Sequence, residues 1–184
     1  MTRLLGALAL LLTLLAMPHA ALADPGDVDA ASRGVVRVVI ITEQNGEPEP
    51  VSHGTGFAVS ASRIVTNAHV VGEAAQDDTL RIGIVPAEGD GGAFARIVAI
   101  SPRNDLALLE IAPGSLRLPP LPLAGGTGAN LGEVTAVGYP MNVDLAQGLD
   151  IKDIFRAQPP VQSRGFLSGA RPSRQFDTIL HSAP

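Results

Sequence analysis

The stretch GTGFAVSASRIVTNAHVV (54–71) places two β-strand patterns on either side of a short polar turn. The second pattern, RIVTNAHVV (63–71), carries one histidine, His69, directly before two valines. A lone histidine in such a run is either a packed residue held by one hydrogen bond or a group that exchanges protons near neutral pH. The rest of the sequence has to separate these two interpretations.

Composition excludes several classes of chemistry. The chain has 184 residues, a net charge of −5 and no cysteine. Disulfides, thiol nucleophiles, thiolate metal sites and CxxC redox motifs are therefore ruled out. The acidic balance, with no cluster of Lys or Arg, argues against a nucleic acid or an anionic membrane as partner.

The N-terminus has the pattern of a secretory signal. Arg3 precedes an uncharged apolar run at 4–17, and Ala21-Leu22-Ala23 supplies the small residues that a signal peptidase reads. We expect residues 1–23 to be a signal peptide, with an uncleaved anchor as the alternative. The expected location is the bacterial periplasm or the exterior, without stable membrane association after cleavage.

Short β-branched runs broken by Gly, Pro, Asn and Asp fill the remaining sequence, at 34–41, 54–60, 63–71, 80–85, 93–100, 106–111, 133–139, 161–169 and 176–182. This spacing, without long amphipathic helices, predicts an antiparallel β-barrel or sandwich. TEQNGEPEP (42–50) is expected to be a polar turn. The Pro- and Gly-rich segment 112–130 is expected to connect two lobes. Residues 141–160 form a long insertion with a helical turn expected at 151–155.

GTGFAVSASRIVTNAHVV resembles the first catalytic segment of trypsin-like serine proteases, especially the bacterial HtrA (Deg) branch. In that family a G-[ST]-G-F strand leads into T-N-x-H-V-V. SPRNDLALLEI (101–111) resembles the family's aspartate segment, and Asp105 is the matching position. GEVTAVGYP (132–140), VQSRGFLSG (161–169) and FDTILHSA (176–183) are similar to later strands of the fold.

The resemblance implies an all-β fold of two antiparallel six-stranded β-barrels. The first would span 34–118 and carry His69 and Asp105, residues 119–130 would connect the barrels, and 131–184 would form an incomplete second barrel. His69 would act as general base and Asp105 would orient its ring, as a buried carboxylate on Nδ1. The alternative for Asp105 is a plain turn residue after Asn104. The resemblance also implies polypeptide substrates and no metal or organic cofactor.

The nucleophile of that family is missing from these 184 residues. No G-x-S-G-G occurs, and the family's serine motif is expected just after Pro184. Ser168 lies in the segment most similar to that motif, with the pattern G-x-x-S-G, and Ser182 lies just before the expected position of the nucleophile. Neither serine is expected to be catalytic. The expected function is therefore an exported serine endopeptidase, represented by an N-terminal part without the nucleophilic serine and oxyanion hole. The alternative is a truncated, inactive binding or regulatory module. A cut inside a strand pair would leave an unpaired edge, which favours the protease interpretation.

Other polar residues predict no second site. The histidines at 53, 69 and 181 lack metal-ligand spacing. Glu110 lies within an apolar strand and is expected at its solvated rim. Exposed turns are expected at four further acidic residues, Asp77, Asp78, Glu88 and Asp90.

Overall fold

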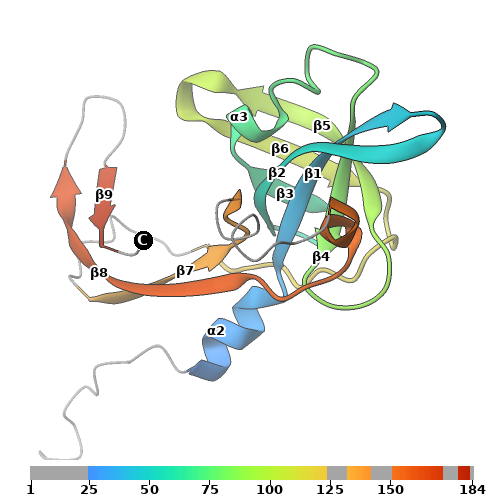
Figure 1. Cartoon of the computed structure of the whole chain (residues 1–184). Coiled ribbons are helices and arrows are strands. Elements are labelled where there is room, and N and C mark those ends of the chain that lie inside the picture. The colour runs from blue at the N-terminus through green and yellow to red at the C-terminus, as the bar shows by residue number, and fades with distance from the viewer. Residues whose placement is uncertain (1–24, 124–131, 142–150, 172–177, 183–184) are drawn as a thin grey trace, which may run out of the picture.

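The computed structural model describes residues 25–123, 132–141, 151–171 and 178–182. Within them the chain forms a closed six-stranded antiparallel barrel and a separate three-stranded sheet (Figure 1). The expected signal peptide, 1–23, lies outside the described residues, as does 124–130 of the expected connection. The bounds expected for the two lobes stay predictions.

The barrel closes in the order β1-β2-β3-β6-β5-β4, so that β1 pairs with both β2 and β4. Its strands are β1 (Val35–Gln44), β2 (Glu47–Ala58), β3 (Arg63–Thr66), β4 (Arg81–Pro86), β5 (Ala93–Ser101) and β6 (Leu106–Ile111). The 3₁₀ helix η1 (Pro102–Asn104) lies in the turn between β5 and β6. The sequence expectation of an antiparallel all-β fold is confirmed for this barrel.

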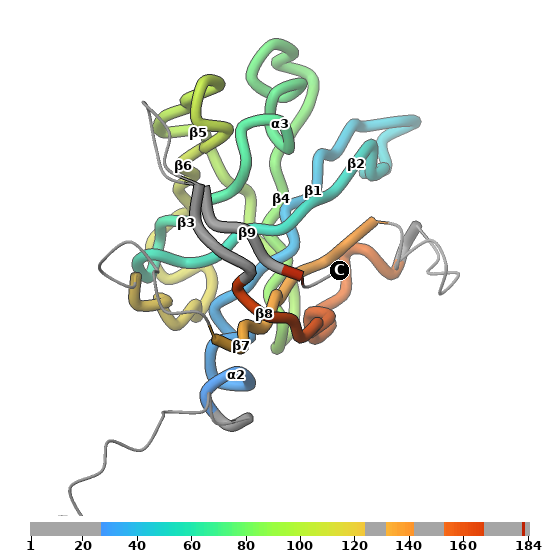
Figure 2. The backbone as a smooth tube through the Cα atoms, turned by 90° about the vertical axis from the view of Figure 1, so that its left-hand side faces the viewer, coloured from blue at the N-terminus to red at the C-terminus, as the bar shows by residue number. Residues whose placement is uncertain are grey.

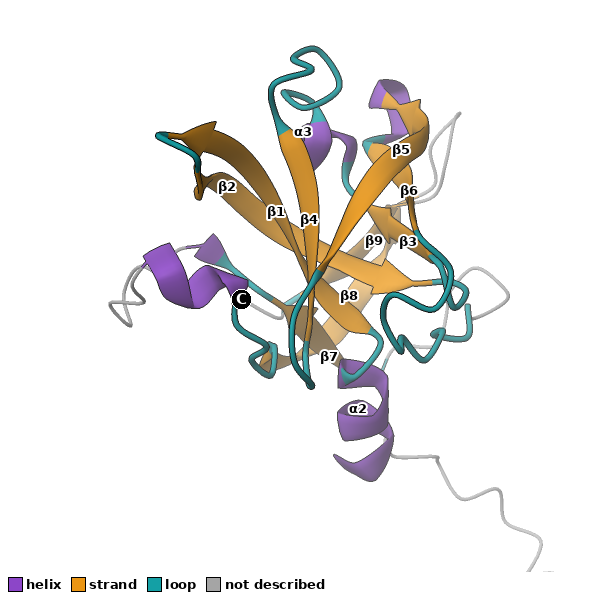
Figure 3. Cartoon of the chain, turned by 90° about the vertical axis from the view of Figure 1, so that its right-hand side faces the viewer, coloured by secondary structure: helices purple, strands orange, loops and turns teal. Residues whose placement is uncertain are grey.

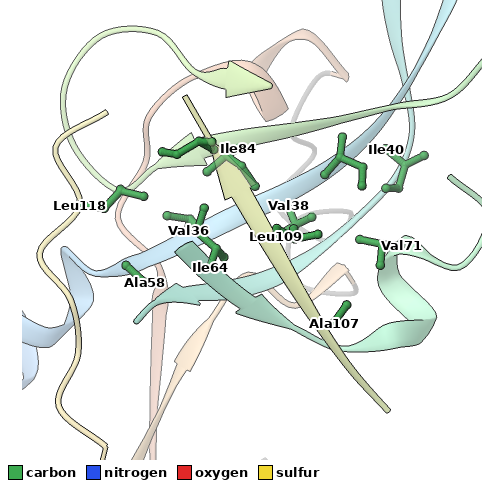
Figure 4. Close-up of a cluster of buried hydrophobic side chains, with 12 residues drawn as sticks. Val36, Val38, Ile40, Ala58, Ile64, Val71, Ile84, Ala107, Leu109 and Leu118 are labelled. Carbon is green, nitrogen blue, oxygen red and sulfur yellow. The ribbon is translucent and has the colours of Figure 1, made fainter. Parts of the chain in front are cut away.

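Alternate side chains of each strand fill the barrel interior. Val36, Val38 and Ile40 point inward from β1 and meet Ile64 and Leu109 from the opposite wall (Figure 4). All five are fully buried. Because successive strand residues point to opposite faces, the β-branched run of β1 supplies a core row and an outer row at once.

Two glycines let β2 approach its neighbours closely. A Cβ on Gly56 would lie 2.8 Å from Ile64 Cγ2 and 3.0 Å from Val38 Cγ2, inside the core. A Cβ on Gly54 would lie 2.7 Å from Cγ2 of Val70, the residue after His69. Gly54 and Gly56 thus leave the room on β2 that β3 and the segment with His69 occupy.

The expected polar turn at 42–50 is wrong in extent. Residues 42–44 continue β1, residues 47–50 begin β2, and Asn45 and Gly46 alone form the turn. Both have positive φ, 55° and 81°, which Asn and Gly tolerate and which suits the twist of a two-residue hairpin. The hairpin projects beyond the barrel (Figure 3).

The expected strand 63–71 is also wrong at its end. Strand β3 stops at Thr66, whose hydroxyl donates to the Thr55 carbonyl (2.7 Å), and Ala68–Val71 form a single helical turn, α3. Asn67 stands at the N-cap position between them, with φ −76° and ψ 146°. The apolar residues on both sides of Asn67 gave this turn the appearance of a continuous strand.

The second sheet contains β7 (Glu133–Gly138), β8 (Val161–Arg171) and β9 (Thr178–His181) in the order β7-β8-β9. A complete second barrel is therefore not present among the described residues, and the finding is a small sheet beside the barrel. Strand β7 contacts β1 and β2 (Figure 2). The helical turn expected at 151–155 is confirmed as the 3₁₀ helix η2 (Ile151–Phe155).

Arg37 joins the barrel to the chain between β7 and β8. It points outward from β1, is 1% exposed, and donates to the Ile154 carbonyl (3.2 Å) and to Gln158 Oε1 (3.3 Å). Its guanidinium lies 4.6 Å from the ring centre of Tyr139, whose hydroxyl donates to the Gln158 carbonyl (2.7 Å). A buried cation is costly without such partners. Arg37 therefore requires this arrangement of the segment between β7 and β8 against the barrel.

Helix α2 (Pro25–Ser32), which the sequence pattern did not predict, precedes β1. Gln162 on β8 donates to Asp29 Oδ1 and Ser32 Oγ, each at 3.2 Å, which fixes α2 against the small sheet. No described helix has the length and apolar character needed to span a membrane.

Substituting Gly56→Ala should lower the free energy of unfolding by about 1–3 kcal/mol, because the new methyl overpacks a filled core. Urea denaturation should show a lower midpoint with an unchanged slope. Gly72→Ala is the matched control, since a Cβ there has no neighbour nearer than 3.4 Å. Equal stability of the two variants would contradict the close approach at Gly56.

Candidate active site

The structure brings His69 and Asp105 together at one end of the barrel. His69 lies on α3, and Asp105 lies between η1 and β6. His69 Nδ1 is 2.8 Å from Asp105 Oδ2, and the His69 main-chain N–H donates to Asp105 Oδ1 at 3.0 Å. Each carboxylate oxygen therefore holds a different part of the same residue.

The Asp105 backbone is left-handed, with φ 51° and ψ 44°. This conformation is uncommon outside glycine, although aspartate tolerates it better than most residues. It reverses the chain between η1 and β6, and it lets the carboxylate reach α3 while Leu106 starts the strand. Asp105 is thus both a turn residue and the partner of His69, two roles that the sequence left as alternatives.

The partner atoms decide which ring nitrogen carries the proton. An ionised carboxylate only accepts hydrogen bonds, so Nδ1 of His69 must be the donor to Oδ2. In a neutral ring the lone pair is then on Nε2, at the opposite end of the imidazole. The His69 side chain is 72% exposed, so a proton donor can approach Nε2 from solvent.

Asp105 is ionised across the neutral range. Hydrogen bonds from the His69 main-chain N–H and then from its ring hold the pKa of the Asp105 carboxyl below its ordinary value, and the Asn67 amide adds to this. The expected buried carboxylate is not found, because the Asp105 side chain is 46% exposed. Its fixed hydrogen bonds, and not desolvation, therefore set its charge state.

Asn67 also belongs to this cluster, although the sequence pattern assigned it no role. Its side-chain N–H₂ donates to the Asp105 carbonyl (3.1 Å) and to Asp105 Oδ2 (3.2 Å). An asparagine two residues before the histidine, at a strand end, was the available signal. Only the fold brings it next to Asp105, 38 positions later in the chain.

The other polar candidates lie in separate surroundings. Glu110 forms ion pairs with Arg63 and Arg96, and Asp77 Oδ1 accepts from the Thr79 main chain and hydroxyl. Ser182 bonds to Phe166, accepting its N–H at Oγ (2.9 Å). Over the described residues, no group of three or more His, Asp or Glu side chains is arranged to hold a metal ion.

A closed antiparallel barrel with a His–Asp pair at its rim, beside a second β-sheet, is the class of architecture found in trypsin-like peptidases. The sequence profile of the trypsin-like peptidase domain matches residues 54–184. The chain belongs to the trypsin-like peptidase family.

Two of the curated relatives are serine proteases, and one of them is named HTRA2. The chain is 32% identical over 125 residues to serine protease Rv3671c of Mycobacterium tuberculosis (strain ATCC 25618 / H37Rv), covering 68% of this chain and 28% of that protein. It is 36% identical over 144 residues to the mitochondrial serine protease HTRA2 of Bos taurus, covering 75% of this chain and 29% of that protein. The chain thus spans less than a third of the length of either relative.

The crystal structure of Deg5 has a similar fold, with a TM-score of 0.62 and 24% sequence identity, over 83% of this chain and 69% of that one. At that identity the likeness shows the fold alone. The resemblance to HtrA and Deg proteases is confirmed. The catalytic roles of His69 and Asp105 stay predictions.

The Asp105 carboxyl should titrate below the ordinary aspartate value of about 3.9. Its midpoint should rise in His69→Ala, but only in part, because the main-chain N–H at position 69 remains. Since the folded pKa is the lower one, the stabilisation from this pair is complete above about pH 4 and is lost as the pH falls through the folded pKa.

Carbon-13 NMR of the side-chain carboxyl measures this midpoint. Asp77 is the internal control, because Thr79 lowers the pKa of its carboxyl and no His69 contact contributes. An Asp105 midpoint that is the same with and without the His69 ring would contradict the pairing.

Proposed function

We propose that His69 and Asp105 are the general base and the orienting acid of a serine endopeptidase that acts on polypeptides. The observation that carries this is the 2.8 Å contact from His69 Nδ1 to Asp105 Oδ2, made by an exposed ring in a chain of the trypsin-like family. Serine protease relatives support the reaction class.

In the proposed reaction, His69 Nε2 takes the proton of the serine hydroxyl as that oxygen attacks the peptide carbonyl, and later gives it to the leaving amine. Asp105 keeps the Nδ1–H tautomer and stabilises the imidazolium that forms in between. Both roles require a carboxylate that stays ionised, and the lowered pKa of Asp105 meets that requirement.

We further propose that the nucleophile and the oxyanion donors come from a G-N-S-G-G-like loop that would follow β9. This rests on the likeness of FDTILHSA to the family strand before that loop, and on the absence of G-x-S-G-G from the 184 residues. The signal-like N-terminus supports export to the periplasm or beyond. The barrel at 34–118, the connection at 119–130 and the second lobe from 131 are proposed as its domains.

In the protease that contains this chain, His69→Ala and Asp105→Asn should each lower kcat by a factor on the order of 10⁴, with only a modest change in KM. The reason is that both side chains act on proton transfer and not on substrate binding. Glu110→Gln is the control, because that carboxylate contacts Arg63 and Arg96 instead. Near-normal turnover by Asp105→Asn would overturn the assignment.

The 184 residues by themselves should not hydrolyse casein above the level of a His69→Ala control, because a base without a nucleophile has nothing to activate. A fluorophosphonate probe tests this directly. Labelling of any serine in these 184 residues that depends on His69 would contradict the proposed location of the nucleophile.

A further inference from the structure

Asn67 stands where an asparagine normally caps a helix, yet its side chain does not cap α3. An N-cap side chain ordinarily accepts the N–H of the second or third helical residue. His69 is the second residue of α3, and its N–H is accepted by Asp105 Oδ1 (3.0 Å) and not by Asn67. The Asp105 carboxylate, from a different part of the chain, therefore caps α3 in place of the Asn67 side chain.

The Asn67 amide instead binds Asp105 at two points. Nδ2 is 3.1 Å from the Asp105 carbonyl oxygen and 3.2 Å from Oδ2, the oxygen that receives the His69 ring. Only the N–H₂ side of the amide can face two acceptor oxygens, which settles its orientation. One rigid group therefore fixes the main chain and the carboxylate of the same residue.

Asp105 needs such a restraint more than most aspartates. Its backbone is left-handed, at φ 51°, and its side chain is 46% exposed to water that competes for both oxygens. A carboxylate that rotates about its Cα–Cβ and Cβ–Cγ bonds would leave the His69 ring free to change tautomer. Holding the carbonyl and Oδ2 together limits that rotation.

We propose that Asn67 is a positioning residue, which fixes the Asp105 carboxylate so that Oδ2 keeps the proton of His69 on Nδ1. This inference rests on the proposed function, in that the fixed tautomer serves the general base. Asn67 does not touch the proton-accepting Nε2, so its action passes through Asp105.

The substitution Asn67→Asp separates positioning from helix capping. Asp and Asn are about equally good N-caps, so a role limited to the N-cap position predicts a normal variant. Positioning predicts the opposite, because the carboxylate has the same shape but no donor and repels Asp105. Asn67→Ala should have a weaker effect of the same kind. Asn104→Ala is the matched control, since that neighbouring amide donates to Ser101 Oγ (3.0 Å).

Nitrogen-15 NMR of the His69 ring at neutral pH reads the tautomer without any need for activity. We expect the ring signals to shift toward the Nε2–H form in Asn67→Asp, less in Asn67→Ala, and not in Asn104→Ala. An unchanged ring in Asn67→Asp, or an equal shift in Asn104→Ala, would overturn the proposal. So would a lower Tm with unchanged ring signals.

Two further measurements keep the test decisive. In the unsubstituted protein, the Asn67 side-chain protons should shift with the same midpoint as the Asp105 carboxyl, and no response would overturn the proposal even if the variants failed to fold. In the active protease, Asn67→Asp should lower kcat by between about ten- and a hundredfold with KM little changed.

The NMR and kinetic results separate this inference from the proposed function. A tautomer shift in Asn67→Asp, together with no His69-dependent hydrolysis by a form of the protein that includes the proposed nucleophile loop, would support the role of Asn67 and reject the proposed protease function. Hydrolysis that depends on His69 but is indifferent to Asn67→Asp, with an unchanged ring, would reject Asn67 alone.

Discussion

Strand β2 carries no side chain at Gly54 and Gly56, and the packing of the barrel depends on that bare backbone. Ile64 and Val38 fill the space beside Gly56, and Val70 fills the space beside Gly54. Val70 follows His69 directly, so the position of the histidine segment depends on the absence of a side chain at Gly54. Close packing of this kind transmits small displacements, because protein interiors have little free volume.

Thr55, between the two glycines, points to the other face and connects the barrel to the second sheet. Its hydroxyl accepts the main-chain N–H of Tyr139 (2.8 Å), and its carbonyl accepts the Thr66 hydroxyl (2.7 Å). Tyr139 in turn stacks on the buried Arg37. Gly54, Thr55 and Gly56 thus contact the core, the histidine segment and the second sheet, and position them relative to one another.

The charge at the site follows from fixed hydrogen bonds. Asp105 receives a main-chain N–H, a ring N–H and a side-chain amide, and these donors lower its pKa although it remains half exposed. An acid held in this way stays ionised without a buried environment. The ring of His69 is consequently oriented by a partner whose charge does not change near neutral pH.

The sequence by itself determined the β-strand content, the segment that carries His69, and the residue that would partner it. These were readable because β-branched runs and the spacing within GTGFAVSASRIVTNAHVV are local properties of the chain. It did not reveal that α3 interrupts the strand after Thr66, that residues 42–50 extend a hairpin, or that α2 precedes the barrel. It also assigned nothing to Asn67. Those features depend on contacts between residues far apart in the chain, because Asp105, and not a neighbour, caps α3 and binds the Asn67 amide. Only the tertiary structure brings these groups within hydrogen-bonding distance, and so only it decided which residues form the site.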